Sequence, residues 1–284
     1  MKVVRTVTDL RAAIGTERAN GASIGLVPTM GAFHAGHEAL MRAARTADIV
    51  VVSLFVNPAQ FGEASDLEAY PRDEARDGRI ARAAGVDLLF VPAFEEMYPA
   101  GFATTVSVAG LTDRLEGVQR GPAHFAAVAT VVVKLLGMVE PEVAFFGQKD
   151  AQQLAVVRRV VADLDLRARI EAVPTVREPD GLALSSRNVR LEPADRERAS
   201  SLSAALRVAE GAVAAGARDP RAIQAAAVGE MAARGVEPEY LELVDPESFS
   251  PLATVNGRVL VAVAARVGNV RLIDNTLIST DQGA

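Results

Sequence analysis

Short apolar segments alternate along the first 175 residues with longer segments in which apolar residues recur at helical spacing. The apolar segments are rich in Val, Ile, Leu and Phe, and few polar residues interrupt them. Such segments are typical of parallel strands that are buried on both faces of a sheet. They predict strands at residues 23–27, 48–55, 86–91, 143–146 and 167–173, and a short β segment at residues 104–108.

The segments between these strands have the periodicity of helices. Thr8 is a suitable N-cap for the first of them, and Pro71 lies near the start of another, where proline is tolerated. We expect helices at residues 8–18, 38–47, 71–84, 124–138 and 148–164. The regular alternation of strands and helices indicates an α/β fold with a doubly wound parallel sheet.

The pattern changes after residue 175. A turn is expected at E-P-D-G, residues 178–181, and two Ala-rich helices are expected at residues 193–215 and 220–234. Three further strands, which we expect to form an antiparallel sheet, are predicted at residues 240–244, 258–265 and 269–274. We therefore place a domain boundary near residue 176. It separates a first domain, residues 1–176, from a smaller α+β domain, residues 177–284.

Composition narrows the classes of partner and compartment. The net charge of −6 and the absence of a dominant basic patch argue against nucleic acid or an anionic membrane as the main partner. The chain has no cysteine, which excludes disulfides and thiolate metal sites and fits a reducing compartment. The N-terminus lacks the apolar stretch of a signal peptide, and the longest apolar run, residues 49–56, is too short to span a bilayer. We expect a soluble cytoplasmic protein.

The most informative stretch is the strand-to-helix corner at residues 26–37, L-V-P-T-M-G-A-F-H-A-G-H. Such corners bind phosphates through backbone N–H groups and the dipole of the following helix. His34 and His37 lie on one side of the first helical turn, where imidazoles can donate hydrogen bonds to a leaving pyrophosphate. A metal site is a rival interpretation, but no third ligand is evident and the H-E-x-x-H pattern is absent. An isolated pair would favour exposed or capping histidines, whereas the strand and P-T-M-G turn before it favour phosphate binding.

A second strand-to-helix corner follows at residues 145–150, F-F-G-Q-K-D. Gly147 would let the backbone approach a ligand closely, and Lys149 could pair with a phosphate. Asp150 could accept hydrogen bonds from ribose hydroxyls or cap the following helix. Taken alone, these residues favour a capping Asp150 and a solvated Lys149.

Two polar loops complete the candidate chemistry. Ser185, Ser186 and Arg187 offer the donors of a phosphate clamp, although the same residues also suit an ordinary polar loop. Asn57 and Gln60 are uncharged and could bind hydroxyl or carboxylate oxygens of a small polar substrate. For Asn57, turn chemistry is the better interpretation because Pro58 follows it.

Several motifs, in this order, resemble those of the pantothenate synthetase (pantoate–β-alanine ligase) family within the nucleotidylyltransferase superfamily. They are P-T-M-G-A-F-H-A-G-H, F-V-N-P-A-Q-F, Y-P-R, H-F-A, F-F-G-Q-K-D-A-Q-Q and D-G-L-A-L-S-S-R-N. The resemblance extends from about residue 8 to residue 273 and is densest before residue 190.

The resemblance implies a Rossmann-like N-terminal domain and a smaller C-terminal domain that closes over ATP. It implies a reaction in which the carboxylate of pantoate attacks ATP to give pantoyl adenylate and pyrophosphate. The amine of β-alanine then displaces AMP to give pantothenate. Mg²⁺ accompanies ATP, and members are typically cytoplasmic homodimers. Adenylation needs positioning and charge neutralisation rather than a protein nucleophile.

The same resemblance implies roles for particular residues. The phosphates would be bound by His34, His37, Lys149, Ser185, Ser186 and Arg187, with His34, His37, Lys149 and Arg187 acting in catalysis. Met30 and Gly31 would line the corner, and the ribose and adenine would be held by Gly147, Asp150 and the backbone of Val176. Gln60 and Gln153 would bind pantoate, with Asn57 nearby. No protein ligand to a metal is assigned.

Some points stay open. The family usually reads R-P-x-H-F, but here Gly121 separates Arg120 from Pro122, which leaves the role of Arg120 undecided. Asp77 could support Mg²⁺ through water or simply lie on a solvated helix face. Another nucleotidylyltransferase of the same fold is the main alternative function, and a catalytically silent nucleotide-binding protein is the third. The uncharged pair Gln60 and Gln153 argues against another nucleotidylyltransferase, and the intact phosphate-binding residues argue against a catalytically silent protein.

Overall fold

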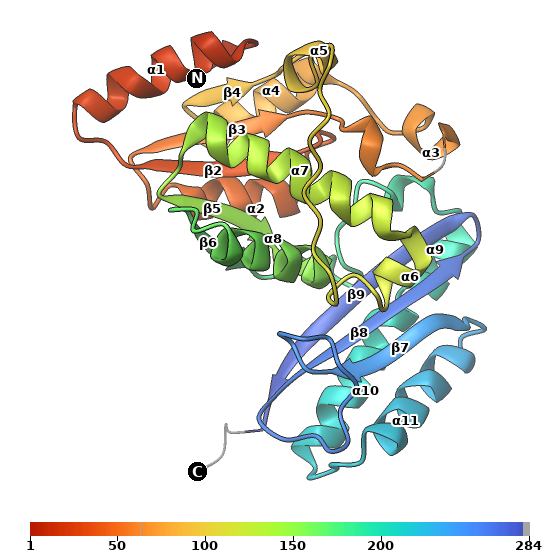
Figure 1. Ribbon diagram of the computed structural model, residues 1–284. Helices are drawn as coiled ribbons and strands as arrows, with labels where there is room; N and C mark the ends of the chain where they lie inside the picture. Colours follow the sequence, from red (N-terminus) through yellow and green to blue (C-terminus); the bar gives the residue numbers. More distant parts are fainter. Residues whose placement is uncertain (63, 281–284) are drawn as a thin grey trace. The chain divides into compact units, whose positions relative to one another are not determined.

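The computed structural model describes residues 1–62 and 64–280, and it divides into two compact units (Figure 1). The first unit comprises Met1–Gln148 and Gln152–Pro174, and the second comprises Lys149–Ala151 together with the chain from Thr175 onward. The division after Pro174 lies close to the boundary that we place near residue 176. The short segment around Lys149 joins the second unit, although it is far from the rest of that unit in the sequence.

The first unit is built on a parallel six-stranded sheet. Its spatial order is β1 (Lys2–Val4), β4 (Leu88–Phe90), β3 (Ile49–Leu54), β2 (Ile24–Thr29), β5 (Val143–Gly147) and β6 (Arg169–Val173). The predicted doubly wound α/β fold is thus confirmed, whereas β1 has no counterpart among the predicted strands. The prediction of a β segment at residues 104–108 is wrong, because these residues form no strand. Instead, the N–H of Val106 donates a hydrogen bond to Oγ1 of Thr130 on a neighbouring helix (2.9 Å).

The helices of the first unit largely follow the predicted periodicity. They are α1 (Val7–Ala19), α2 (Ala35–Ala44), α3 (Ala64–Glu68), α4 (Glu74–Ala83), α5 (Phe94–Met97), α6 (Glu116–Arg120), α7 (Pro122–Val139) and α8 (Ala151–Asp163), with the 3-10 turn η1 (Pro58–Gln60). A second 3-10 turn, η2 (Gln148–Asp150), precedes α8, and most of it belongs to the second unit. Helix α4 begins later than predicted because Asp73, rather than a residue near Pro71, caps it: its side chain accepts a hydrogen bond from the N–H of Arg76. The expected start of α8 is instead the turn η2.

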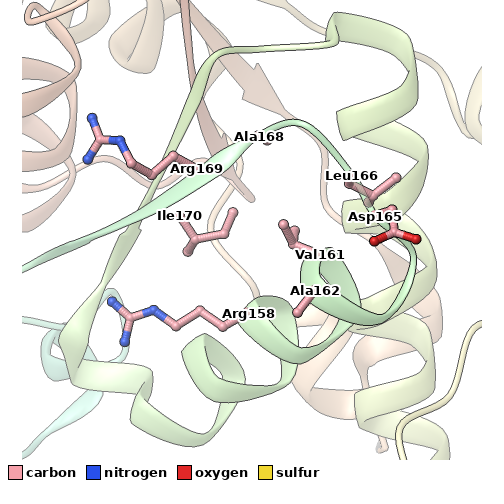
Figure 2. A pocket seen from close by; sticks show the side chains of 8 residues that line it. All are labelled: Arg158, Val161, Ala162, Asp165, Leu166, Ala168, Arg169 and Ile170. Atoms are coloured by element: carbon pink, nitrogen blue, oxygen red, sulfur yellow. The ribbon is translucent and has the colours of Figure 1, made fainter.

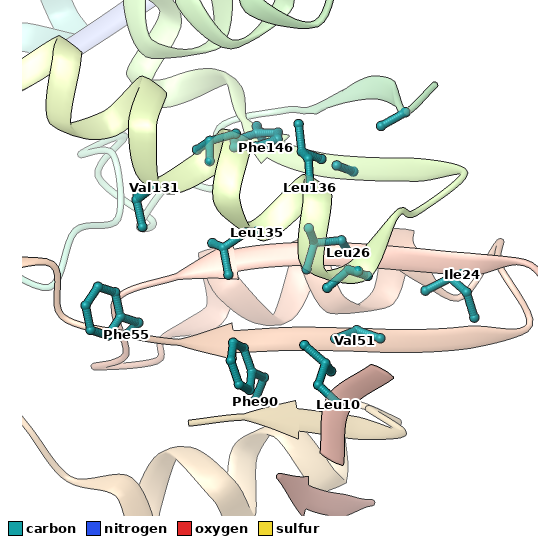
Figure 3. Close-up of a cluster of buried hydrophobic side chains, with 14 of the residues drawn as sticks. Leu10, Ile24, Leu26, Val51, Phe55, Phe90, Val131, Leu135, Leu136 and Phe146 are labelled. Atoms are coloured by element: carbon teal, nitrogen blue, oxygen red, sulfur yellow. The ribbon is translucent and has the colours of Figure 1, made fainter. Parts of the chain in front are cut away.

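Two apolar clusters bury the faces of this sheet. In one, Leu10 of α1 and Leu135 of α7 pack with Leu26 and Val51 of the central strands (Figure 3). In the other, Met41 of α2 and residues of α4 cover the remaining face. Helix α7 is long and apolar enough to cross a membrane by length and composition, yet 56% of its most apolar window is buried within the protein. We interpret α7 as the central core helix of this unit.

The second unit is an antiparallel sheet packed against helices. Its strands, in the order β7 (Pro238–Val244), β8 (Arg258–Val267) and β9 (Val270–Ser279), confirm the expected antiparallel sheet. The accompanying elements are α9 (Pro193–Ala199), α10 (Ser201–Ala214), α11 (Pro220–Ala232) and the 3-10 turn η3 (Asn188–Arg190). The helix predicted at residues 193–215 is divided, because Ser200 ends α9 and precedes α10. Strand β9 runs past its predicted end because Ser279 still pairs with Arg258.

Candidate active site

The corner between β2 and α2 carries the two adjacent histidines of the first unit. Strand β2 ends at Thr29, and α2 begins at Ala35 with His34 as its N-cap in an extended conformation. His34 and His37 form a capping box in which each side chain accepts a hydrogen bond from the backbone of the first turn. The predicted strand, turn and helix are therefore confirmed, and the histidines cap the helix rather than extending into solvent.

The capping bonds fix how each imidazole can interact with a ligand. Nδ1 of His34 accepts from the N–H of Gly36 (3.1 Å), and Nδ1 of His37 accepts from the N–H of His34 (3.3 Å). In a neutral ring the proton therefore sits on Nε2, which is a hydrogen-bond donor. The ring centroids lie 4.2 Å apart, so the two rings are in contact at the N-terminus of α2. This arrangement suits an anion, because the helix dipole also favours negative charge there.

We expect His37 to stay neutral throughout the physiological pH range. Burial, reinforced by neighbouring His34, lowers the pKa of His37 from 6.5 to about 3. Between these values the unfolded chain binds more protons than the folded one. The contribution of His37 to the free energy of unfolding is thus complete above pH 6.5 and falls on acidification, by at most about 1.4 kcal/mol per pH unit. Imidazole NMR shifts would test this, and a His37 resonance that titrates near pH 6.5 would contradict it.

Two residues of α4 fix the loop before His34. Asp77 is 1% exposed, and its carboxylate accepts hydrogen bonds from the N–H groups of Ala32 (2.7 Å) and Phe33 (2.8 Å). Nη1 of Arg76 donates to the carbonyl of Phe33 (3.0 Å). The interpretation that Asp77 simply lies on a solvated helix face is therefore wrong. Local periodicity could not reveal this contact, because Asp77 lies more than 40 residues from the loop that it binds.

Both oxygens of Asp77 are engaged by the loop, so this carboxylate is poorly suited to a metal ion. Within residues 1–62 and 64–280, no group of three or more His, Cys, Asp or Glu side chains could hold one. Mg²⁺ is commonly bound through substrate phosphates, with only one or two protein carboxylates. The donor set of the described chain therefore does not form a dedicated Mg²⁺ site.

Asn57 and Gln60 lie on a second loop of the first unit, at the end of β3. Asn57 is 1% exposed and caps η1: its Oδ1 accepts from the N–H of Ala59 (3.3 Å) and from the hydroxyl of Tyr98 (3.2 Å). The carbonyl of Gln60 accepts a hydrogen bond from Nδ1 of His124 (2.8 Å), which places the ring proton on Nδ1. Asn57 thus has the turn role that its sequence context favours. Substrate contacts by Asn57 and Gln60 stay predictions.

The two glutamines at the start of α8 differ in environment. Gln152 is 4% exposed; it accepts from the N–H of Glu116 (3.0 Å) and donates to the carbonyls of Leu111 (2.6 Å) and Arg114 (2.9 Å). It holds the segment before α6 in place. Gln153, the predicted pantoate ligand, is half-buried, and its role stays a prediction.

Arg120, whose role the sequence leaves undecided, closes α6. Its Nε donates to Oε2 of Glu116 one turn earlier (2.6 Å). Gly121 then separates α6 from α7 with a positive φ of 78°. The extra glycine therefore forms a helix-to-helix turn, and Arg120 has a structural partner in Glu116.

In the second unit, a short hairpin leads to the predicted phosphate clamp. The N–H of Leu184 donates to the carbonyl of Val176 (3.0 Å), and Arg177 pairs with Ala183. The expected turn at residues 178–181 is confirmed by a hydrogen bond from the N–H of Gly181 to the carbonyl of Glu178 (2.8 Å). Ser185 and Arg187 follow directly, and Oγ of Ser185 accepts from the N–H of Arg187 (3.3 Å). Ser186 is half-buried beside them.

Lys149 and Asp150 also belong to the second unit, in the turn η2 that follows Gly147. Both side chains are half-buried. Nδ2 of Asn275, on β9, donates to the backbone carbonyl of Lys149 (2.7 Å). Asn275 follows Asp274, which forms a two-pronged ion pair with Arg177 (2.5 and 3.0 Å). Sequence reasoning missed this network, because nothing local indicates that a polar pair in the middle of a strand binds the backbone of a distant lysine.

Met30 and Gly31 lie in the corner of the first unit, as their sequence position requires. Met30 is half-buried, and Gly31 has a φ of +85°. A Cβ at Gly31 would lie 2.9 Å from Oδ2 of Asp77, so this position requires glycine. Ligand contacts by either residue stay predictions.

A cavity of about 480 Å³ lies elsewhere in the first unit, between α8 and β6 (Figure 2). Its lining is formed by Arg158, Val161, Ala162, Asp165, Leu166, Ala168, Arg169 and Ile170. None of the candidate site residues is among them. We therefore do not connect this cavity with the histidine corner.

Comparisons with known proteins agree with the motifs. A sequence model of the family described as Pantoate-beta-alanine ligase matches residues 2–277. A pantothenate synthetase from Rhizorhabdus wittichii is 50% identical over 280 residues, which cover 98% of this chain and 99% of the relative. One from Moorella thermoacetica is 48% identical over 283 residues, which cover 99% of this chain and 100% of the relative.

Solved structures extend the likeness to the fold. The crystal structure of pantothenate synthetase from Thermus thermophilus has a TM-score of 0.92 and 46% identity, covering 97% of this chain and 99% of its own. A pantoate-beta-alanine ligase from Francisella tularensis, complexed with Beta-gamma ATP and beta-alanine, has a TM-score of 0.81 and 31% identity, covering 100% and 99%. With a family match over almost its whole length, this chain belongs to the pantoate–β-alanine ligase family.

Proposed function

We propose that this protein condenses pantoate with β-alanine in an ATP-dependent reaction that passes through pantoyl adenylate. The observation that supports this most directly is the pair of contacting imidazoles at the N-terminus of α2, each with Nδ1 engaged by a backbone N–H. A family relative was solved with Beta-gamma ATP and beta-alanine, which are a nucleotide and an amine of the required kinds. The products are pantothenate, AMP and pyrophosphate.

In the first step, a carboxylate oxygen of pantoate attacks the α-phosphorus of ATP, and the bond from this phosphorus to pyrophosphate breaks. Negative charge grows on the phosphate oxygens as this occurs. Neutral imidazoles that donate Nε2–H bonds stabilise such charge without having to lose a proton. Since the pKa of His37 is about 3, its ring is already in this form at neutral pH. His34 is its partner in the role.

The family resemblance assigns the remaining phosphate contacts of this proposal to four further residues. Lys149 contributes a compact positive charge, and Ser185, Ser186 and Arg187 contribute donors. Gly147, Asp150 and the backbone of Val176 hold the ribose and adenine, while Met30 and Gly31 line the corner. Mg²⁺ would enter bound to ATP, since the described chain has no carboxylate cluster for it.

Gln60 and Gln153 bind the hydroxyl and carboxylate oxygens of pantoate in this proposal, with Asn57 supporting the loop of Gln60. In the second step, the amine of β-alanine attacks the acyl carbon of pantoyl adenylate. The bond from that carbon to AMP breaks, and the attacking nitrogen loses a proton. Uncharged amide ligands suit an acceptor that carries no phosphate, which favours the ligase over another nucleotidylyltransferase.

A cytoplasmic location and a homodimeric state also belong to the proposal, on the basis of the family resemblance. The proposed reaction depends on neither of them. Size-exclusion chromatography with light scattering would test the dimer, and a single mass near 29.9 kDa would contradict it.

The deciding assay measures AMP, pyrophosphate and pantothenate with purified protein, ATP, Mg²⁺, pantoate and β-alanine. We expect equal amounts of the three products, and pantoyl adenylate when β-alanine is omitted. Omitting pantoate is the matched control and should abolish AMP release. AMP that forms equally without pantoate, or never forms, would rule out the ligase.

A further inference from the structure

Asp77 is a buried carboxylate that the proposed chemistry does not use. It lies on α4 and is 1% exposed. Charged side chains are rarely buried to this extent unless hydrogen bonds or ion pairs compensate for lost hydration. Here the compensation is specific: Oδ2 accepts from the N–H of Ala32 (2.7 Å) and Oδ1 from the N–H of Phe33 (2.8 Å). The carboxylate therefore binds the backbone immediately before His34.

This stretch of backbone has an unfavourable conformation. Gly31 and Ala32 have consecutive positive φ values of +85° and +52°. A residue with a Cβ rarely adopts the conformation of Ala32, and such a conformation persists only where the surroundings hold it. Asp77 provides that support through the N–H of Ala32 itself. Glycine at position 31 allows the carboxylate to approach so closely.

Arg76 binds the same loop through the carbonyl of Phe33, whereas Asp77 binds the N–H of that residue. Its Nη1 donates to the carbonyl of Phe33 (3.0 Å) and lies 3.6 Å from Oδ1 of Asp77. Residues 76 and 77 thus hold both the N–H and the carbonyl of Phe33. The ring of Phe33 is fully buried and lies 5.3 Å from that of His37, centroid to centroid. A shift of Phe33 would therefore move both the N-cap and the ring beside it.

We propose that Asp77 is a positioning residue for catalysis, and that it sets the directions of the His34 and His37 rings by holding the loop that precedes α2. This inference rests on the proposed function, since the two histidines act on the phosphates of ATP. Asp77 touches no reacting atom. Its effect reaches the reaction through the backbone of residues 32–34.

The first test is Asp77→Asn, which preserves shape and removes one of the two acceptors. The amide nitrogen would then face a backbone N–H, so the loop would have to shift. We expect kcat for AMP formation to fall by about 10- to 100-fold, as for a displacement of about 1 Å. KM for pantoate should change by less than about threefold, because its ligands lie on other elements. Asp73→Asn is the matched control: it alters the exposed N-cap of the same helix, and kcat should stay within about twofold because Asn is an equally good cap.

A double-mutant cycle separates positioning from a general structural effect. If Asp77 acts through the two histidines, the loss of kcat caused by Asp77→Asn should be at least about threefold smaller in a His37→Ala background, where only His34 is left to position. An equal loss of kcat in both backgrounds would overturn the proposal, as would wild-type kcat in the single variant. A His37→Ala enzyme with wild-type kcat would instead count against the proposed function of the histidine corner.

Arg76→Met keeps the proposal testable if Asp77→Asn does not fold. The Arg76 side chain is 49% exposed, so its loss should be tolerated, while the bond to the Phe33 carbonyl disappears. We expect a decrease in kcat of about 3- to 10-fold that also shrinks in the His37→Ala background. Unchanged kcat in a folded Arg76→Met protein, with Asp77→Asn unfolded, would overturn the proposal.

Discussion

Replacing Lys149 with alanine is expected to lower kcat for AMP formation by about 100- to 1,000-fold, the effect of losing one electrostatic contact to a transition state. In the proposed reaction, negative charge moves from the pantoate carboxylate onto the phosphates, and Lys149 is the lysine that we propose to neutralise it. An interaction that strengthens as charge develops acts mainly on kcat. KM for ATP should change less than kcat, since the proposal includes several other donors to the phosphates.

The Lys149→Ala protein should fold normally. Asn275 binds the main-chain carbonyl of residue 149, which alanine retains, and the lysine side chain is only half-buried. The control is Lys2→Ala, which removes an exposed lysine of β1 and should leave kcat within about twofold. Circular dichroism and steady-state kinetics suffice for both variants. A Lys149→Ala enzyme within about threefold of wild type would remove Lys149 from the mechanism.

Replacing Arg177 with alanine is expected to destabilise the second unit by about 3 kcal/mol, because it leaves a buried carboxylate without its partner. Asp274 is 3% exposed, and Arg177 bonds both of its oxygens. Arg177 also donates to the carbonyls of Gly181 (3.0 Å) and Asn275 (3.3 Å), so four hydrogen bonds disappear together. Urea denaturation followed by circular dichroism would measure the loss.

Arg196→Ala is the matched control for this prediction. Arg196 pairs with Asp180 and Glu178 in the same unit, but those carboxylates are 41% and 30% exposed and remain hydrated when the arginine is removed. Exposed pairs contribute about 0–1 kcal/mol, so the control should lose little. Equal losses for the two variants would show that burial of Asp274 does not determine the strength of its pair.

Elements with a strong local pattern could be predicted from the sequence. The apolar residues of β3 and α7 mark a buried strand and a central helix, and the structure has both. Ser200 gives no comparable signal, because Ala-rich sequence continues on both sides of it and only the structure reveals the change from α9 to α10. The prediction for residues 104–108 is wrong for the opposite reason. These residues have the β-branched composition of a strand, but the N–H of Val106 bonds the side chain of Thr130 on α7.

In the candidate site, too, local features could be predicted from the sequence and contacts between distant residues could not. His34 and His37 could be paired from sequence because a helix N-terminus is a local feature, and its capping box uses residues three apart. The residues that support this corner could not be predicted from the sequence. Asp77 and Arg76 reach it from α4 through hydrogen bonds to the main chain, and no residue pattern indicates such bonds. Likewise, motif spacing indicates Lys149 but not Asn275, whose side chain binds a carbonyl that every residue type possesses.

The bond from Asn275 to the carbonyl of Lys149 has a consequence for how the protein is made. The two residues are 126 positions apart, and Asn275 lies on the last strand of the second unit. At ordinary rates of synthesis, about 6–25 s pass between the appearance of one residue and that of the other. During that interval the histidine corner can fold, while the turn around Lys149 still lacks its donor. A nascent chain on the ribosome therefore carries the histidine corner for many seconds before the carbonyl of Lys149 gains its donor from Asn275.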